Sequence, residues 1–168
     1  DDIISFNSQT NVSCFGGDDG SITFNTFLGT AGYYYSINGS SQQYSQNSNF
    51  VISNLSSGTY SVLITDTLGC SYANNPVVLN ISQPSSALSA SSTSSDYSGF
   101  GVSCNGGSDG NVSVSVIGGT PSYSYLWSNG ATTNTISNIS EGIYTCNVSD
   151  ANGCVIPTVS VVIDEPSE

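Results

Sequence analysis

Residues 102–110 read VSCNGGSDG, and residues 12–20 read VSCFGGDDG, so the chain contains the same motif twice. In both copies the Gly-rich turn leads into a run in which apolar and polar residues alternate, from residue 21 and from residue 111. Such alternation places the apolar side chains on one face of a strand. Asp-Gly and Gly-Gly supply the positive φ angles that a tight turn needs. Each copy therefore predicts a turn followed by a half-buried strand.

The similarity continues beyond the motif as two tandem repeats. Counting back 90 residues from Cys104 reaches Cys14, and counting back 84 residues from Cys154 reaches Cys70. The offset changes by six residues within one loop, and loops tolerate insertions. Because many matches occur in the same order, we predict two domains, residues 1–84 and 85–168, with the boundary at Pro84–Ser86.

Short strand patterns separated by Gly-containing turns recur through both repeats, and no helical periodicity competes with them. This pattern predicts an all-β fold of two tandem Ig-like β-sandwiches. The Ser-rich segment 87–95 could be a flexible linker, but we favour a polar first strand, since residues 2–6 occupy the matching place. The predicted strands are 2–7, 21–27, 32–37, 50–53, 58–65 and 76–82 in domain one, and 87–94, 111–117, 122–128, 133–137, 142–149 and 156–164 in domain two.

Aromatic residues mark the predicted core. Tyr123, Tyr125 and Trp127 share one strand face, and aromatic side chains carry much of a small core. Tyr60 and Tyr144 each end a Leu/Ile-x-x-Gly-x-Tyr motif that resembles the tyrosine corner of Ig-like sandwiches, in which the hydroxyl bonds back to upstream backbone.

Four of the five cysteines recur between the repeats. Pairing within each repeat, Cys14–Cys70 and Cys104–Cys154, is the simplest of the possible connectivities, and we predict one disulfide in each domain. Disulfides indicate an oxidising compartment. Cys146 has no cysteine at the matching position of the other repeat. It lies two residues after Tyr144, on the same face of the predicted strand, which predicts a free thiol buried in the core.

The charge balance excludes several functions. The chain has no Lys, Arg or His and a formal net charge of -12. It cannot neutralise phosphates, so we predict no nucleic-acid partner. No apolar run approaches the ~20 residues of a membrane span, so we expect no direct membrane insertion. There is no imidazole or lysine for catalysis and no carboxylate pair held on adjacent strands, as a glycosidase needs, so we predict that the chain is not an enzyme.

The uncompensated carboxylates make Ca²⁺ the one cofactor to consider. Such a site needs six to eight oxygen ligands, and no EF-hand spacing is present. The candidate ligands are therefore first interpreted as turn-forming residues: Asp18, Asp19, Asp109 and Asp164. Three Asn-x-Ser sequons in predicted turns, at Asn38, Asn54 and Asn138, are candidate glycosylation sites.

A family resemblance is carried by residues 102–110, by residues 118–130 (GGTPSYSYLWSNG) and by residues 142–154 (GIYTCNVSDANGC). These segments resemble the SprB repeat of very large surface adhesins in gliding Bacteroidetes. Domain one keeps the cysteines and the Gly-Gly-x-Asp-Gly turn but lacks the Pro and the Trp of domain two.

The resemblance implies several functional properties of the chain. It implies type IX secretion to the cell surface and an extended filament that serves adhesion or gliding, with neighbouring copies of the same repeat or subunit as partners. Asp66-Thr67-Leu68 also resembles an O-glycosylation signal of that phylum, which makes Thr67 a candidate site.

A carbohydrate-binding module is the alternative function. In that interpretation surface glycans stack on exposed tyrosines, whose side chains are not expected to face the core: Tyr34, Tyr44, Tyr72 and Tyr97. A single contiguous patch of these side chains would favour the alternative.

Overall fold

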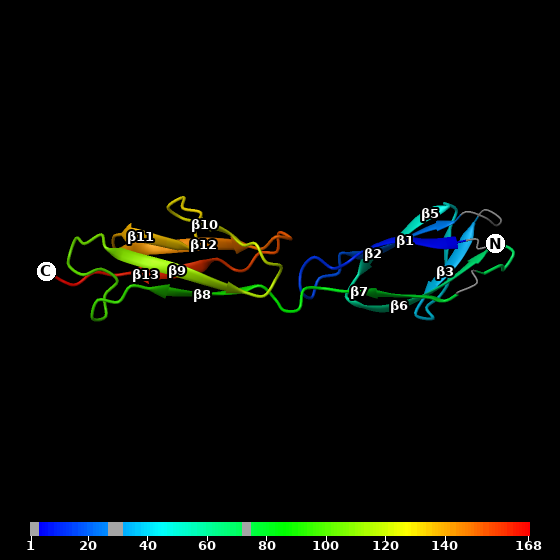
Figure 1. Ribbon diagram of the computed structural model, residues 1–168, viewed down its shortest axis with the longest axis horizontal. Helices are drawn as coiled ribbons and strands as arrows, with labels where there is room; N and C mark the ends of the chain where they lie inside the picture. Colours follow the sequence, from blue (N-terminus) through cyan, green and yellow to red (C-terminus); the bar gives the residue numbers. More distant parts are fainter. Residues whose placement is uncertain (1–3, 27–31, 72–74) are drawn as a thin grey trace. The chain divides into compact units, whose positions relative to one another are not determined.

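The computed structural model describes residues 4–26, 32–71 and 75–168. These residues form strands, turns and loops, with no helix among them (Figure 1). The chain divides into two compact units, Asp1–Gln83 and Pro84–Glu168. No described segment is a helix long and apolar enough to cross a membrane.

Unit one is a sandwich of two antiparallel sheets. One sheet has the order β1-β2-β5 and the other has the order β4-β3-β6-β7 (Figure 1). The strands are β1 Ile4–Thr10, β2 Gly20–Thr26, β3 Tyr33–Ile37, β4 Gln43–Ser45, β5 Asn49–Leu55, β6 Gly58–Asp66 and β7 Val77–Ile81.

Unit two repeats this architecture without a counterpart of β4. Its sheets have the orders β11-β9-β8 and β10-β12-β13. The strands are β8 Ser89–Ser94, β9 Gly110–Ile117, β10 Ser124–Trp127, β11 Thr135–Ile139, β12 Gly142–Ser149 and β13 Val159–Ile163. The predicted all-β, Ig-like sandwich fold is confirmed.

Alternating strand residues from both sheets fill each core. In unit one the Phe24 and Phe50 rings stack at 5.5 Å, and Tyr35 stacks on Phe50 at 5.0 Å. In unit two Trp127 is buried and its indole Nε1 donates to the Thr133 carbonyl at 2.8 Å, so the ring's polar atom is satisfied. Tyr125 packs against the same core, as its strand phase predicted.

Both predicted tyrosine corners are present. The Tyr60 hydroxyl donates to the Ser56 carbonyl at 2.8 Å, and the Tyr144 hydroxyl donates to the Ser140 carbonyl at 3.2 Å. Each bond fixes the chain where it passes from one sheet to the other, just before β6 or β12.

The Ser-rich segment of unit two is a strand, as the repeat alignment predicted. β8 pairs antiparallel with β9 from Ser89–Ile117 to Ser94–Val112. Most of its side chains are exposed, and its place at a sheet edge explains the polar composition, because polar edge strands resist pairing with other chains.

Each unit has two ends, which we name by the course of the chain. The leading end is where the first strand begins, at Ile4 in unit one and Ser89 in unit two. The trailing end is where the last strand ends, at Ile81 and Ile163. β6 and β12 start at the trailing end, because Gly58 pairs with Ile81 and Gly142 pairs with Ile163, and they run to the leading end.

Candidate functional site: cysteine turns at the two ends of each unit

The first cysteine turn of unit one connects β1 to β2. Asp19 closes it by accepting hydrogen bonds from the backbone N–H of Ser13 at 2.9 Å and from the Ser13 hydroxyl. The Gly17 N–H donates to the Cys14 carbonyl at 2.9 Å, and Gly16 adopts a φ of 76°, which favours glycine. The bonds from the Ser13 hydroxyl and backbone lower the pKa of Asp19, so the carboxylate stays ionised and keeps the turn closed.

Unit two builds the same turn from the second copy of the motif. The Ser103 N–H donates to the Asp109 carboxylate at 3.0 Å, and the Gly107 N–H donates to the Cys104 carbonyl at 2.9 Å. The bonds from Ser103 lower the pKa of Asp109. Both Asp residues thus act as turn-forming residues.

Contacts with the residues that follow the last strand place these turns at the trailing end. The Gly16 N–H donates to Gln83 Oε1 at 2.7 Å, and the Gly106 N–H donates to Glu165 Oε2 at 2.7 Å. We did not predict a role for Gln83 and Glu165. Their recurrence before a proline, in the sequences ISQP and IDEP, was the available signal.

The second cysteine turn lies at the leading end and is organised by a buried aspartate. In unit one Asp66 Oδ1 accepts hydrogen bonds from the N–H groups of Leu68 at 2.9 Å and Cys70 at 2.8 Å. The Asp66 N–H donates to the Cys70 carbonyl at 2.9 Å, which closes the turn. Asp66 is only 2% exposed, so these donors replace water around the carboxylate.

Asp150 plays the same part in unit two. Its Oδ1 accepts from Asn152 and Cys154, both at 2.9 Å, and its Oδ2 accepts from the Thr120 N–H at 2.8 Å. Burial alone would raise the pKa of Asp150, but the backbone donors of the turn outweigh burial, so that the pKa is lowered. The native turn therefore contains Asp150 in its ionised form, held by these hydrogen bonds.

The states of the cysteines correct the predicted pairing. Cys70 and Cys104 are free and exposed, whereas Cys14 and Cys154 are disulfide-bonded. Neither Cys14–Cys70 nor Cys104–Cys154 can form, because each pair has one member at each end of its unit. The nine residues of β6 span about 26 Å, while the two Cα atoms of a disulfide lie within about 7 Å of each other.

Cys146 is free and fully buried in the core of unit two. Burial raises the pKa of its thiol, and the sulfur makes a weak 3.7 Å hydrogen bond to the Asn147 carbonyl. The side chain behaves as a small apolar group of the core.

The candidate metal ligands do not form a metal-binding cluster, although Asp18 and Asp19 are adjacent in the sequence. Among the described residues no group of three or more His, Cys, Asp or Glu side chains could hold a metal ion. Besides Asp19 and Asp109, Asp164 also serves a turn, since its Oδ1 accepts from the Gly101 N–H at 3.0 Å.

The tyrosines proposed as a sugar platform are divided between the units. Tyr34 and Tyr44 are exposed and adjacent, with ring centroids 5.1 Å apart. Tyr97 belongs to unit two, where its hydroxyl donates to the Asp109 carbonyl at 3.3 Å. Tyr72 lies outside the described residues. The described tyrosines therefore provide one pair and no larger patch.

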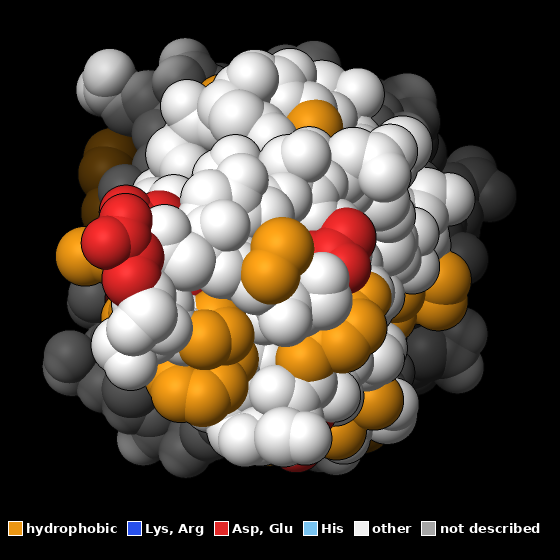
Figure 2. All heavy atoms as spheres, turned by 90° about the vertical axis from the view of Figure 1, so that its left-hand side faces the viewer, with side chains coloured by type: hydrophobic (Ala, Val, Ile, Leu, Met, Phe, Trp, Pro, Cys, Tyr) orange, Lys and Arg blue, Asp and Glu red, His pale blue; other side chains and the backbone are white. Residues whose placement is uncertain are grey.

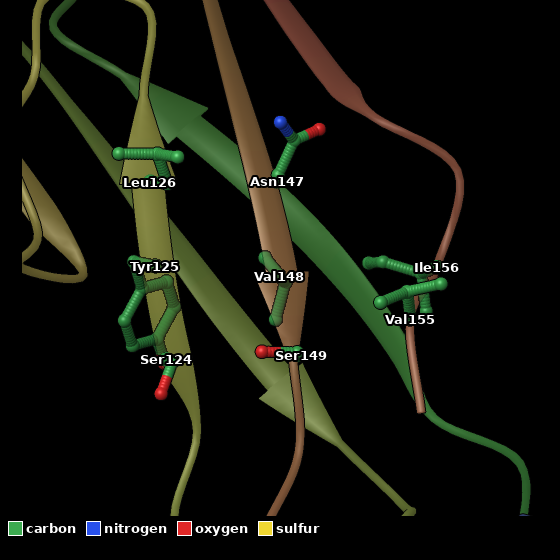
Figure 3. A pocket seen from close by; sticks show the side chains of 8 residues that line it. All are labelled: Ser124, Tyr125, Leu126, Asn147, Val148, Ser149, Val155 and Ile156. Atoms are coloured by element: carbon green, nitrogen blue, oxygen red, sulfur yellow. The ribbon is translucent and has the colours of Figure 1, made fainter. Parts of the chain in front are cut away.

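Unit two also has an open pocket of about 440 Å³ on the β10-β12-β13 sheet (Figure 3). Tyr125 and Leu126 on β10 form one side, and Val155 and Ile156, on the segment that precedes β13, form the other. The β12 residues between them are Asn147, Val148 and Ser149. No ionisable pair that could support catalysis lines this pocket.

The candidate glycosylation sites are all at the surface. Thr67, Asn38, Asn54 and Asn138 are exposed. The three asparagines adopt positive φ angles of 50°, 59° and 57°, a backbone conformation that Asn tolerates better than most residues. Their glycosylation remains a prediction.

Two Ig-like units, each with a cysteine turn at either end, define this chain as a tandem β-sandwich repeat protein. The family model of the SprB repeat matches residues 7–42 and 102–132. Each match contains the trailing-end cysteine turn of one unit, so the predicted resemblance to the SprB repeat is confirmed.

Other comparisons give structural similarity at low sequence identity. A C-terminal 282-residue fragment of intimin, solved with the intimin-binding domain of the translocated intimin receptor, aligns with 15% identity and a TM-score of 0.48. The alignment covers 97% of this chain and 63% of the fragment, so the chain spans less than two thirds of its length. Fibronectin(III)-like modules of Clostridium thermocellum CbhA align with 14% identity and a TM-score of 0.40, over 96% of this chain and 93% of theirs. No curated protein matches the chain.

Proposed function

We propose that the chain is a non-enzymatic, extracellular repeat module of an adhesive cell-surface filament. The observation that carries this proposal is the repetition of the same two cysteine turns, one at each end of each unit, in a chain that matches the SprB repeat twice. In an array each repeat contacts mainly its neighbours.

The acidic composition supports the same proposal. With a net charge of -12 and no basic residue, filaments of this protein repel one another and remain dispersed. The proposed partners are neighbouring copies of the repeat or subunit, and the proposed location is the cell surface, reached by type IX secretion. Adhesion or gliding is the proposed role.

Electron microscopy of negatively stained native material tests the proposal. We expect thin filaments at the cell surface that antibodies against this chain label along their length. Deletion of the coding sequence should remove these filaments and reduce attachment or gliding. Labelled globular particles, with unchanged attachment in the deletion strain, would contradict it.

Carbohydrate binding is the second candidate, favoured by the exposed Tyr34–Tyr44 pair. If this pair is a sugar platform, Tyr44→Ala should abolish glycan binding measured by calorimetry, since stacking on aromatic rings is lost. Tyr97→Ala, a change of an exposed tyrosine in the other unit, is the matched control. Equal binding by both variants would remove this candidate.

A further inference from the structure

The strand β10 lies at one edge of the β10-β12-β13 sheet of unit two, and one side of its backbone is open. Just after β10, the Ser128 N–H donates to the Thr145 carbonyl at 2.8 Å, across to β12. Successive residues of an antiparallel strand direct their backbone groups to alternate sides. Tyr123 and Tyr125 therefore direct their backbone N–H and C=O groups away from β12. On that side they have no partner among the described strands of unit two.

Unit one has a strand on the corresponding edge. Its equivalent of β10 is β3, whose Tyr33 and Tyr35 pair with Ser45 and Gln43 of β4. β4 lies within the loop that is six residues longer in unit one than in unit two. The longer loop thus supplies an edge strand in unit one, and its absence leaves the edge of β10 uncovered in unit two.

The other edge strands of unit two are better protected against pairing with a second chain. β8 and β13 lie next to each other, where the two sheets meet. β11 has a register shift between Ser137 and Ile139, with Asn138 at a φ of 57°, and such irregularities interrupt strand pairing. β10 contains no charged residue, no proline and no register shift, so it is the edge of unit two that a further strand can extend.

The distribution of charge indicates the partner. No acidic residue lies between Asp109 and Glu141, the segment that contains β9, β10 and β11. The trailing end of unit two, in contrast, exposes acidic side chains beside hydrophobic ones and no basic ones (Figure 2). A basic partner would be drawn to such acidic ends. A second copy of this chain has carboxylates and no cation, so it approaches most easily along the uncharged edge of β10.

We propose that two copies of the chain pair through their β10 edges, antiparallel, about a two-fold axis at Ser124. Tyr123 of each copy then lies opposite Tyr125 of the other, and each such pair exchanges two backbone hydrogen bonds. Pairing ends at Trp127, because its N–H already donates to the Ala131 carbonyl and its carbonyl accepts from the Gly130 N–H, both at 2.9 Å. The two three-stranded sheets become one continuous sheet, in which β10 of one copy adjoins β10 of the other.

This pairing goes beyond the proposed function and does not depend on it. A two-fold contact uses the same edge of both copies and is therefore closed. Association through β10 stops at two copies, and the carboxylates outside this edge keep the pairs apart from one another. A filament that contains the contact would consist of two strands side by side.

Sedimentation equilibrium of the full chain tests the pairing, after Cys70 and Cys104 have been alkylated so that no new disulfide forms. At about 0.15 M NaCl, where the Debye length is about 8 Å, we expect the mass to rise with protein concentration from one chain toward two. Ser124→Glu should remain monomeric, because like charges directly opposite each other destabilise strand pairing. Ser115→Glu, the same change at an exposed position on the central strand β9, is the matched control and should still dimerise.

A charge exchange at the axis determines the register. Ser124→Lys and Ser124→Glu should each be monomeric alone, and native mass spectrometry of their equimolar mixture should show the heterodimer. In the wild-type chain, hydrogen exchange of the Tyr125 amide should slow as the protein concentration rises.

Three results would overturn the inference: a wild-type chain that is monomeric at every concentration, a Ser124→Glu variant that dimerises as well as Ser115→Glu, or an unprotected Tyr125 amide in the dimer. Protection of the Tyr44 amide together with that of Tyr125 would also overturn it, since it would identify β4 of the second copy as the partner strand. None of these results bears on the presence of filaments at the cell surface, which electron microscopy tests separately.

Discussion

The charged residue most completely enclosed by hydrogen bonds in unit two is Asp150. We expect Asp150→Asn to lower the free energy of unfolding of unit two at neutral pH by about 2 kcal/mol, since an amide cannot accept from Thr120 on one side and from Asn152 and Cys154 on the other. Urea denaturation of the variant and of Glu141→Gln, an exposed carboxylate in the same unit, measures the effect. Equal losses in the two variants would contradict it.

The lowered pKa of Asp150 also predicts a pH dependence. The folded pKa lies below the ordinary value of about 4, so the stabilisation is fully present above pH 4 and is lost as the pH falls through the folded pKa. The wild-type unfolding midpoint should decline in this acid range. The Asp150→Asn protein should decline less, and parallel curves for the two proteins would show that Asp150 is not responsible.

The three free cysteines should react with a thiol reagent at very different rates. Cys70 and Cys104 are exposed, whereas Cys146 has no exposed surface and burial raises the pKa of its thiol, so little reactive thiolate is available. Mass spectrometry during iodoacetamide treatment of native protein should show two rapid modifications, and a third only after denaturant is added. Rapid labelling of Cys146 in native protein would contradict its buried position.

At the scale of the strands, the tyrosine corner is the feature that sequence predicted best, because its spacing and its hydrogen bond are both local. Tyr144→Phe should lower the free energy of unfolding by about 1 kcal/mol, the net value of one hydrogen bond. Tyr125→Phe is the control, because the Tyr125 side chain packs against the same core and its hydroxyl makes no hydrogen bond with the described residues. Calorimetry that found no difference between the two variants would contradict this assignment.

Strands were predicted correctly where apolar and polar residues alternate in the sequence, or where the other repeat has a strand at the matching position. β9 and β12 bury every second residue over much of their length, and their pattern is visible in the sequence. β8 has no such pattern and was predicted only from its counterpart β1. β4 was missed because it has three residues, none of them buried, and exists only through its pairing with Tyr33, Tyr34 and Tyr35.

At the scale of the whole molecule, recurrence identified the four repeated cysteines but not their connectivity. Pairing within a repeat and pairing between successive repeats use the same positions, so one sequence with two repeats fits either. The direction of β6 and β12 excludes pairing within a repeat, because these strands carry the chain from the trailing end to the leading end between the two cysteines. The length of β6 alone would have suggested that the two cysteines of a repeat lie at opposite ends of their unit, since Gly58 and Asp66 are the two ends of one uninterrupted strand.

The net charge of -12 predicts how assembly depends on salt. Every encounter between copies brings together surfaces with no basic side chain, and the Debye length falls from about 30 Å at 0.01 M to about 8 Å at 0.15 M ionic strength. The rate at which copies of the chain associate, followed by light scattering, should therefore rise steeply with NaCl over this range. CaCl₂ at equal ionic strength should give the same rate, because the Asp109 and Glu165 carboxylates already accept backbone hydrogen bonds within their own turn. A much faster rate in CaCl₂ would instead show that Ca²⁺ bridges acidic side chains of different copies. A rate that does not change with NaCl would show that electrostatic repulsion between copies does not limit their association.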